Sequence, residues 1–166
     1  TTTDRTPWWL LVLRMLAVAL VIAGFAGPVL NPQSERAGSG PLLIVMDATW
    51  ADARDWQSRI DRVDALVSEA GRAGRTVAIV RLTDLPHGGR PFQAASDWAA
   101  RLGGLTPNPW APDAGAVTDW ATQLNGQFES FWLSDGLLHA ARATVLAALE
   151  THGPVTVFES PRPVLA

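Results

Sequence analysis

Four oxygen-bearing side chains occupy the positions in this sequence where chemistry is easiest to place. Asp47 and Thr49 follow one apolar run, and Ser134 and Asp135 follow a second. Carboxylate and hydroxyl oxygens are the ligands that Mg²⁺ and Ca²⁺ prefer. If the two runs lie side by side, the four residues form a small oxygen-rich pocket of the kind that holds a hard cation.

The apolar runs before Asp47 and before Ser134 come together only if both are strands of one sheet. Residues 41–46, the run before Asp47, and residues 76–82 are typical of buried parallel strands, and an amphipathic helix over 52–73 joins these two segments. The remaining expected elements are helices at 94–102, 113–124 and 138–151 and strands at 130–133 and 155–158. This alternation predicts a doubly wound, mostly parallel α/β sheet in a Rossmann-like three-layer fold, whose ligands bind beyond the carboxyl ends of the strands.

The N-terminal run from Trp8 to Leu30 predicts a transmembrane helix. Arg14 is its single charged residue, and its long side chain can reach back toward the headgroups or pair with a neighbouring helix. Trp8 and Trp9 suit the membrane–water boundary. Two other interpretations are a buried core helix and a cleavable signal peptide with small residues at 23–27.

The chain divides into four parts on this interpretation. Residues 1–30 hold the membrane helix, 31–40 a flexible linker, 41–160 the α/β domain and 161–166 a tail beyond which the chain is expected to continue. Arg5 and Arg14 lie before or early in the helix, which favours a cytoplasmic N-terminus, a single span and an extracytoplasmic domain. The bilayer is therefore the first expected partner.

Composition excludes several classes of function. The net charge is −3 and Lys and Arg are not clustered, so nucleic acid is not an expected partner. The absence of cysteine excludes disulfides, Cys-based metal sites and a thiol nucleophile, and leaves the redox compartment open. No glycine-rich phosphate loop follows an early strand, which argues against nucleotide binding.

The histidines and serines offer little support for catalysis. His87, His139 and His152 are scattered and are expected on the surface. Ser134 does not lie in a G-x-S-x-G elbow, so no catalytic residue is assigned. Asp47 and Asp135 also suit a purely structural role, because aspartates at strand-to-helix turns often accept backbone N–H bonds.

Tryptophan supplies the candidate contact surface. Trp50 and Trp110 fall in loops on the expected ligand-facing edge, where exposed tryptophans often dominate the energy of protein contacts. Asp113 and Ser134 lie on the same predicted edge. These four residues are the predicted partner-binding set.

The residues that follow the strands carry a resemblance to a known family. An apolar strand ending in D-x-[ST]-x-S, here Asp47 and Thr49, and a later strand ending in Asp135-Gly136 resemble the von Willebrand factor A domain and its metal-ion-dependent adhesion site. The N-terminal stretch RTPWWLLVLRMLAVALVIAGFAGPVL resembles the helix before such a domain in bacterial aerotolerance (Bat-type) membrane proteins. The resemblance implies a protein of the bacterial inner membrane whose A-like domain contacts other envelope or membrane proteins, a MoxR-type ATPase system among them. It also implies Asp47, Thr49 and Asp135 as ligands of Mg²⁺ or Ca²⁺.

The sequence departs from the family pattern in the metal site. Ala51 stands where the pattern has a second hydroxyl, and the glycine–threonine pair expected near residues 110–115 is missing. Asp113 is either a substitute carboxylate or the N-cap of the next helix. The metal site is therefore interpreted as degenerate, with no bound cofactor expected.

The leading hypothesis is a non-enzymatic envelope protein that binds another protein through this edge. The alternatives are a membrane-tethered hydrolase that uses Ser134 or Asp135, and a passive scaffold whose function lies in segments outside this chain.

Overall fold

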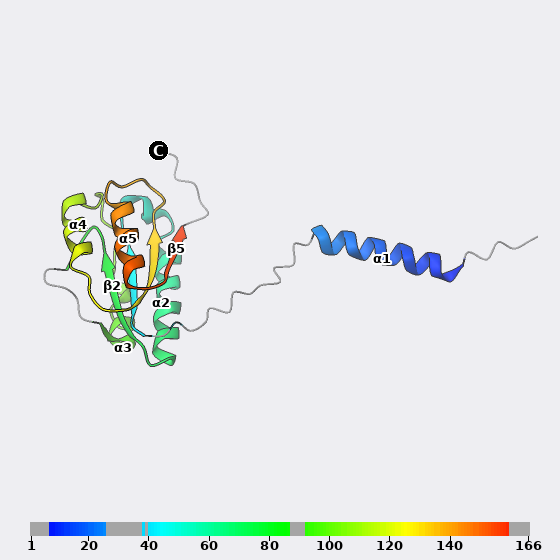
Figure 1. The fold of residues 1–166 in the computed structure, drawn as a ribbon, viewed down its shortest axis with the longest axis horizontal. Helices are drawn as coiled ribbons and strands as arrows, with labels where there is room; N and C mark the ends of the chain where they lie inside the picture. The colour runs from blue at the N-terminus through cyan, green and yellow to red at the C-terminus, as the bar shows by residue number, and fades with distance from the viewer. Residues whose placement is uncertain (1–6, 26–37, 39, 87–91, 160–166) are drawn as a thin grey trace, which may run out of the picture. The chain divides into compact units, whose positions relative to one another are not determined.

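The computed structural model describes residues 7–25, 38, 40–86 and 92–159 of the chain (Figure 1). It divides into two compact units, Thr1–Arg36 and Ala37–Ala166, which are described separately. His87, the linker after residue 30 and the tail from residue 161 lie outside the described residues.

The first unit contains one helix, α1 (Trp8–Phe25). The helix begins where the sequence predicts, and Trp8, Trp9 and Leu13 are all more than half exposed. Its 18 residues measure about 27 Å at 1.5 Å per residue, against a hydrocarbon core of about 30 Å. No helix in the described part of the chain is both long and apolar enough to cross a membrane. The span predicted for Trp8–Leu30 is therefore not shown, and residues 26–30 lie outside the described residues.

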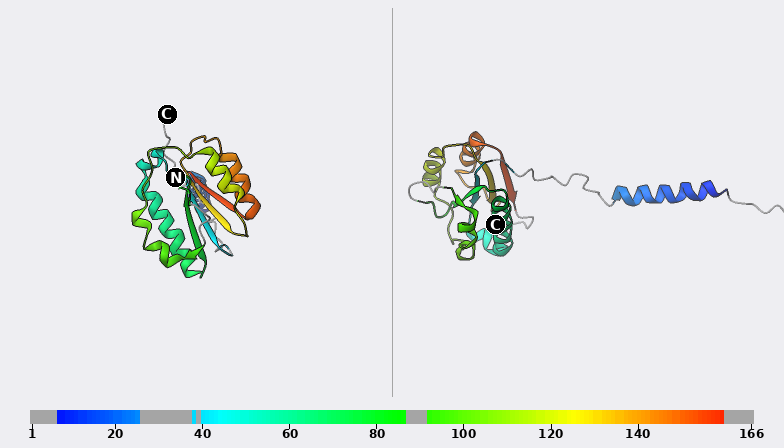
Figure 2. Two further views of the ribbon diagram at one scale, coloured as in Figure 1. Left: turned by 90° about the vertical axis from the view of Figure 1, so that its left-hand side faces the viewer. Right: turned by 90° about the horizontal axis from the view of Figure 1, so that it is seen from below.

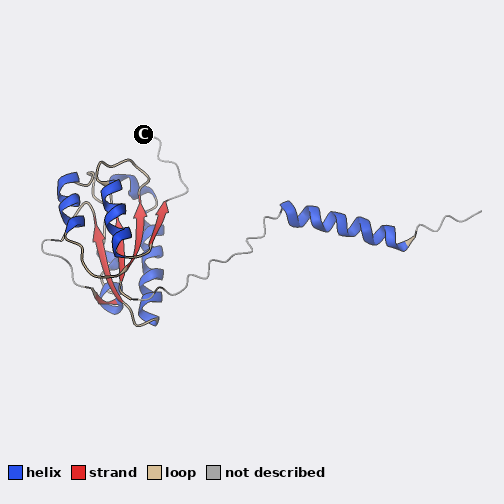
Figure 3. Ribbon diagram, in the orientation of Figure 1, coloured by secondary structure: helices blue, strands red, loops and turns tan. Residues whose placement is uncertain are grey.

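The second unit is built on a five-stranded sheet (Figure 3). Its strands are β1 (Leu42–Met46), β2 (Thr76–Arg81), β3 (Gln93–Ala94), β4 (Glu129–Ser134) and β5 (Val155–Glu159), in the spatial order β3-β2-β1-β4-β5. Four strands are parallel, and β3 runs antiparallel to β2. The predicted α/β fold with a mostly parallel sheet is confirmed; β3 has only two residues and gives no detectable sequence pattern.

Helices cover both faces of the sheet (Figure 2). One face packs against α2 (Trp56–Arg72) and α3 (Ala95–Ala99), and the other against α4 (Ala114–Thr122) and α5 (Arg142–His152). The strands alternate accordingly, because successive side chains point to opposite faces. In β1, Ile44 belongs to the core under α2 and Val45 to the core under α5. Both faces are therefore sealed, which explains the continuous apolar runs.

Three predicted helices have different bounds in the structure. The helix predicted over 52–73 is preceded by a separate 3₁₀ turn, η1 (Trp50–Arg54), which Thr49 caps through a hydrogen bond from Ala51 N. The helix predicted over 94–102 is divided into α3 and a second 3₁₀ turn, η2 (Leu102–Gly104). The helix predicted from residue 138 begins only at Arg142, since hydrogen bonds to Asp135 hold the preceding loop.

Candidate functional site at the carboxyl edge of the sheet

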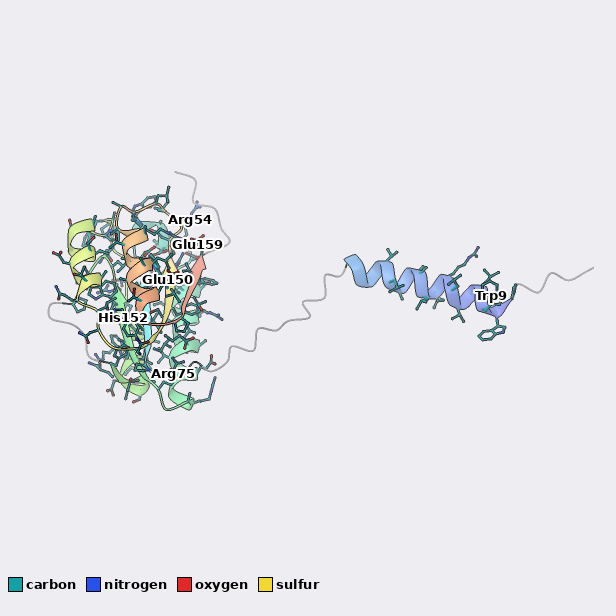
Figure 4. The ribbon with its side chains drawn as sticks, in the orientation of Figure 1. Trp9, Arg54, Arg75, Glu150, His152 and Glu159 are labelled. Atoms are coloured by element: carbon teal, nitrogen blue, oxygen red, sulfur yellow. The ribbon has the colours of Figure 1, made fainter. Side chains whose placement is uncertain are left out.

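The carboxyl ends of β1 and β4 lie side by side, with Met46 paired to Leu133. This end of the sheet is opposite the end that holds Arg75, as the labels of Arg75 and Glu159 show (Figure 4). We call it the carboxyl edge. The candidate residues predicted from the sequence, Asp47 and Thr49 after β1 and Ser134 and Asp135 at the end of β4, lie at this edge.

A sharp turn follows β1 and brings Thr49 toward β4. Ala48 has a φ of 54°, in the left-handed region that residues with a Cβ seldom adopt. The carbonyl oxygen of Ala48 accepts hydrogen bonds from Asn108 N at 2.8 Å and Thr83 Oγ1 at 3.2 Å, and these bonds stabilise the unfavourable backbone conformation. Ala48 is fully buried, so the surrounding loops hold this conformation in place.

Asp47 is a buried acceptor between two donors from β4 and the loop that follows it. Its Oδ1 accepts from Trp132 Nε1 and its Oδ2 from Asp135 N, each at 2.8 Å. Asp47 has no exposed surface. The structure therefore brings Asp47 and Asp135 together, as parallel neighbouring strands require.

Asp135 is the centre of a second set of hydrogen bonds. Its Oδ2 accepts from Thr49 Oγ1 at 2.6 Å and lies 2.9 Å from His139 Nε2, and its Oδ1 accepts from Leu137 N at 2.9 Å. A carboxylate only accepts, so the imidazole nitrogen is the donor. The expectation that His139 is a simple surface residue is wrong: its side chain is 18% exposed and anchors the loop to Asp135.

His152 also differs from its predicted place on the surface. It is half-buried and stacks on Phe128 with ring centroids 5.1 Å apart, at the other end of the sheet from Asp135. Its Nδ1 lies 2.7 Å from the carbonyl oxygen of Gly126. The residue supports local packing and takes no part in the carboxyl edge.

A buried ion pair fastens α2 to the same edge. Arg59 lies 2.9 Å from Asp52 Oδ1 and 3.2 Å from Asp55 Oδ1, and its Nη1 donates to the carbonyl oxygen of Ser134 at 3.1 Å. Asp52 in turn accepts from Thr49 N at 3.2 Å. Arg59 and Asp52 are almost fully buried, so their charges compensate each other away from water.

Burial raises the pKa values of all these carboxyl groups, but hydrogen bonds reverse the net shift at Asp135. Desolvation, together with the charge of Asp135, raises the pKa of Asp47 to about 6. Desolvation also raises the pKa of Asp52 to about 7, although Arg59 opposes the rise. Burial opposes ionisation of Asp135 too, but hydrogen bonds from Thr49, His139 and Leu137 outweigh it and lower its pKa.

These pKa shifts predict a stability that falls as pH rises from about 4 to about 7. Asp47 and Asp52 keep protons in the folded domain at pH values where the unfolded chain, with a carboxyl pKa of 3.8, has lost them. The free energy of unfolding should therefore decline, by up to about 1.4 kcal/mol per pH unit for each group. Thermal unfolding of the full chain at several pH values measures this slope. Asp52→Asn should flatten it and Asp64→Asn, on the exposed face of α2, should not; an equal slope in all three proteins would contradict the prediction.

Asp47, Asp135 and His139 bring ligand-type atoms within 4.8 Å of one another. These residues do not, however, fit a hard cation. All four carboxylate oxygens already accept N–H or O–H donors, and Ala51 contributes no oxygen. Mg²⁺ and Ca²⁺ need six or more oxygen ligands, several of them often from water, and the two aspartates are almost fully buried.

Comparison with known proteins adds evidence for the N-terminal part of the chain. Residues 1–28 match the family model described as BatA, aerotolerance regulator N-terminal. The match ends before the α/β domain begins. No curated protein matches the chain. The strand order and directions of the α/β domain are consistent with a von Willebrand factor A-like domain.

Of the four predicted partner-binding residues, Trp50, Trp110 and Asp113 are exposed and Ser134 is buried. Trp50 and Trp110 are 52% and 55% exposed, and Trp110 Nε1 donates to the carbonyl oxygen of Thr83 at 3.2 Å. Asp113 is the N-cap of α4 and accepts from Ala116 N at 2.7 Å. Ser134 is fully buried, so its side chain offers no contact surface.

Sequence reasoning missed Arg59, His139 and the exposed Leu138. Arg59 could have been found, because it lies on the inward stripe of α2 four residues before the buried Val63. The role of His139 could not be predicted in this way, because its hydrogen bond to Asp135 depends on a loop that the sequence pattern assigned to a helix.

Proposed function

We propose that this chain is a membrane-associated, non-catalytic protein of the bacterial cell envelope, similar to aerotolerance regulators, whose α/β domain binds another protein. The match over residues 1–28 and the apolar, exposed side chains of α1 support attachment to the inner membrane. The placement of Arg5 and Arg14 supports an extracytoplasmic position for the domain.

The observation that carries the proposal is a group of exposed apolar side chains at the carboxyl edge. Trp50, Trp110 and Leu138 are 52%, 55% and 96% exposed, and we call them the edge surface. Trp50 follows β1 and Leu138 follows β4, while the hydrogen bond of Trp110 places it beside the segment after β2. Single exposed apolar residues are common, but large ones gathered along one edge mark contact surfaces.

The side-chain chemistry of the edge surface suits a protein partner. Tryptophan buries a large area and keeps an N–H for a hydrogen bond, which is why it dominates the energy of many interfaces. The partner would be another envelope or membrane protein, with a MoxR-type ATPase system as the candidate that the family resemblance suggests.

The hydrolase alternative is less well supported. The hydroxyl of Ser134 accepts hydrogen bonds from Arg142 Nη1 at 2.7 Å and Gly136 N at 3.2 Å. The guanidinium of Arg142 offers donors and no acceptor, so it cannot act as a general base. The buried hydroxyl is therefore engaged in holding the loop after β4.

Site-specific cross-linking tests the proposed contact. A photo-reactive amino acid at Leu138 or Trp110 of the full chain, in the membranes of the producing bacterium, should form a discrete adduct with a protein. The same probe at Glu150, exposed on α5 (Figure 4), should not. Trp50→Ala should reduce the adduct at Leu138 about tenfold, the effect of losing a hot-spot residue. Equal adducts from all positions, or adducts with lipid alone, would contradict a protein contact at this edge.

A further inference from the structure

The hydrogen bonds of Asp135 leave little for a cation to coordinate. Its Oδ2 accepts two donors, Thr49 Oγ1 at 2.6 Å and His139 Nε2 at 2.9 Å, which use both lone pairs of that oxygen. The remaining carboxylate oxygens of Asp135 and Asp47 each accept one N–H. A metal could enter only by displacing donors that are already well placed.

We infer that His139 takes the place of a divalent cation, so that the carboxyl edge is assembled by the protein's own donors and without a metal. The imidazole N–H stabilises the Asp135 carboxylate that a cation would otherwise neutralise. Thr49 and Trp132 supply the other side-chain donors to the aspartate pair, and their side chains are buried beside it. His139 is in this sense a positioning residue for the loop that follows β4.

The consequence is a rigid loop that presents Leu138. Leu137 N donates a hydrogen bond to Asp135 Oδ1, and Leu137 O accepts one from Arg142 Nη1 at 3.2 Å. His139, on the other side of Leu138, donates a hydrogen bond to the same carboxylate of Asp135. Leu138 thus lies between two anchored residues and is itself 96% exposed.

Arg142 closes the loop from its C-terminal side. Its guanidinium bonds Ser134 Oγ at 2.7 Å, pairs with Glu159 at the end of β5 and lies over the ring of Trp132, 5.4 Å from the centroid. These contacts connect the loop to β4 and β5 independently of Asp135. A variant at His139 therefore loosens the loop without removing every support.

A metal titration of the full chain in mild detergent provides the first test. Thermal unfolding is followed in EDTA and in 1 mM Mg²⁺, Ca²⁺, Mn²⁺ or Zn²⁺, about the concentration needed to occupy a weak extracellular-type site. The inference expects the same unfolding temperature in every buffer. A saturable rise with any of these ions that Asp47→Asn removes would overturn it, because it would show a working metal site.

Amide exchange in His139 variants provides the second test. In EDTA, His139→Ala should speed exchange of the Leu137 amide about tenfold, as expected when a support to a charged hydrogen-bond acceptor is lost. His139→Gln retains an N–H donor and should restore most of the protection, while Glu150→Ala on the exposed face of α5 should leave it unchanged. Exchange in His139→Ala equal to that of the parent chain would overturn the positioning role. Neither test involves a partner, so both outcomes are independent of the proposed protein contact.

Discussion

Replacing Arg59 with methionine is expected to lower the free energy of unfolding by about 3–5 kcal/mol, the cost of leaving a buried charge without its partner. Asp52 would keep its place beneath the edge, only 1% exposed, with no cation beside it. The carbonyl oxygen of Ser134 would also lose its donor. The structure therefore assigns this buried pair a larger effect than any exposed ion pair of the domain.

Chemical denaturation of the full chain at pH 8 measures this effect, since Asp52 is mostly ionised there. Arg72→Met, on the exposed last turn of the same helix, is the matched control and should stay within about 0.5 kcal/mol of the parent chain. Adding Asp52→Asn to Arg59→Met should recover part of the loss, because it removes the uncompensated charge. A single variant no less stable than the Arg72 control would show that the ion pair contributes nothing.

The fold and the meeting of Asp47 with Asp135 were predictable because both follow from short-range rules. Continuous apolar runs fixed β1 and β4 as buried strands, and parallel neighbours place their carboxyl ends at one edge. The residue after each strand then has little freedom. The hydrogen bond between Asp135 N and Asp47 is the outcome.

Other features depend on contacts that no local pattern encodes. The segment from residue 138 has helical periodicity, yet hydrogen bonds from Leu137 and His139 to Asp135 keep it in a loop until Arg142. Here a few bonds to a buried carboxylate outweigh about a turn of helix, whose net stability in isolation is small. The sequence therefore placed His139 on a helix surface, and only the structure places it on Asp135.

Helix α2 is held against the domain by its apolar stripe and by Arg59, and only the stripe could be predicted from the sequence. Arg59 lies within the stripe and conflicts with its apolar pattern unless a buried carboxylate is available to it. Asp52 supplies that carboxylate from η1, a short 3₁₀ turn that propensity alone did not distinguish from the helix. Local conflicts of this kind often mark positions where tertiary contacts determine the structure.

Asp47→Asn is expected to destabilise the domain by about 2–3 kcal/mol, because asparagine offers one acceptor oxygen where the structure requires two. Trp132 Nε1 and Asp135 N approach separate oxygens of Asp47, so one of them would face an amide NH₂ in the variant. Urea denaturation of the full chain measures the loss, and Asp64→Asn on α2 serves as the control.

Trp132→Phe, combined with Asp47→Asn, removes one of the two donors, and the introduced asparagine amide can then turn its oxygen to Asp135 N. The double variant should therefore be about 1 kcal/mol more stable than the sum of the single losses predicts. Strict additivity would mean that Trp132 and Asp47 stabilise the domain independently, contrary to the bond that joins them.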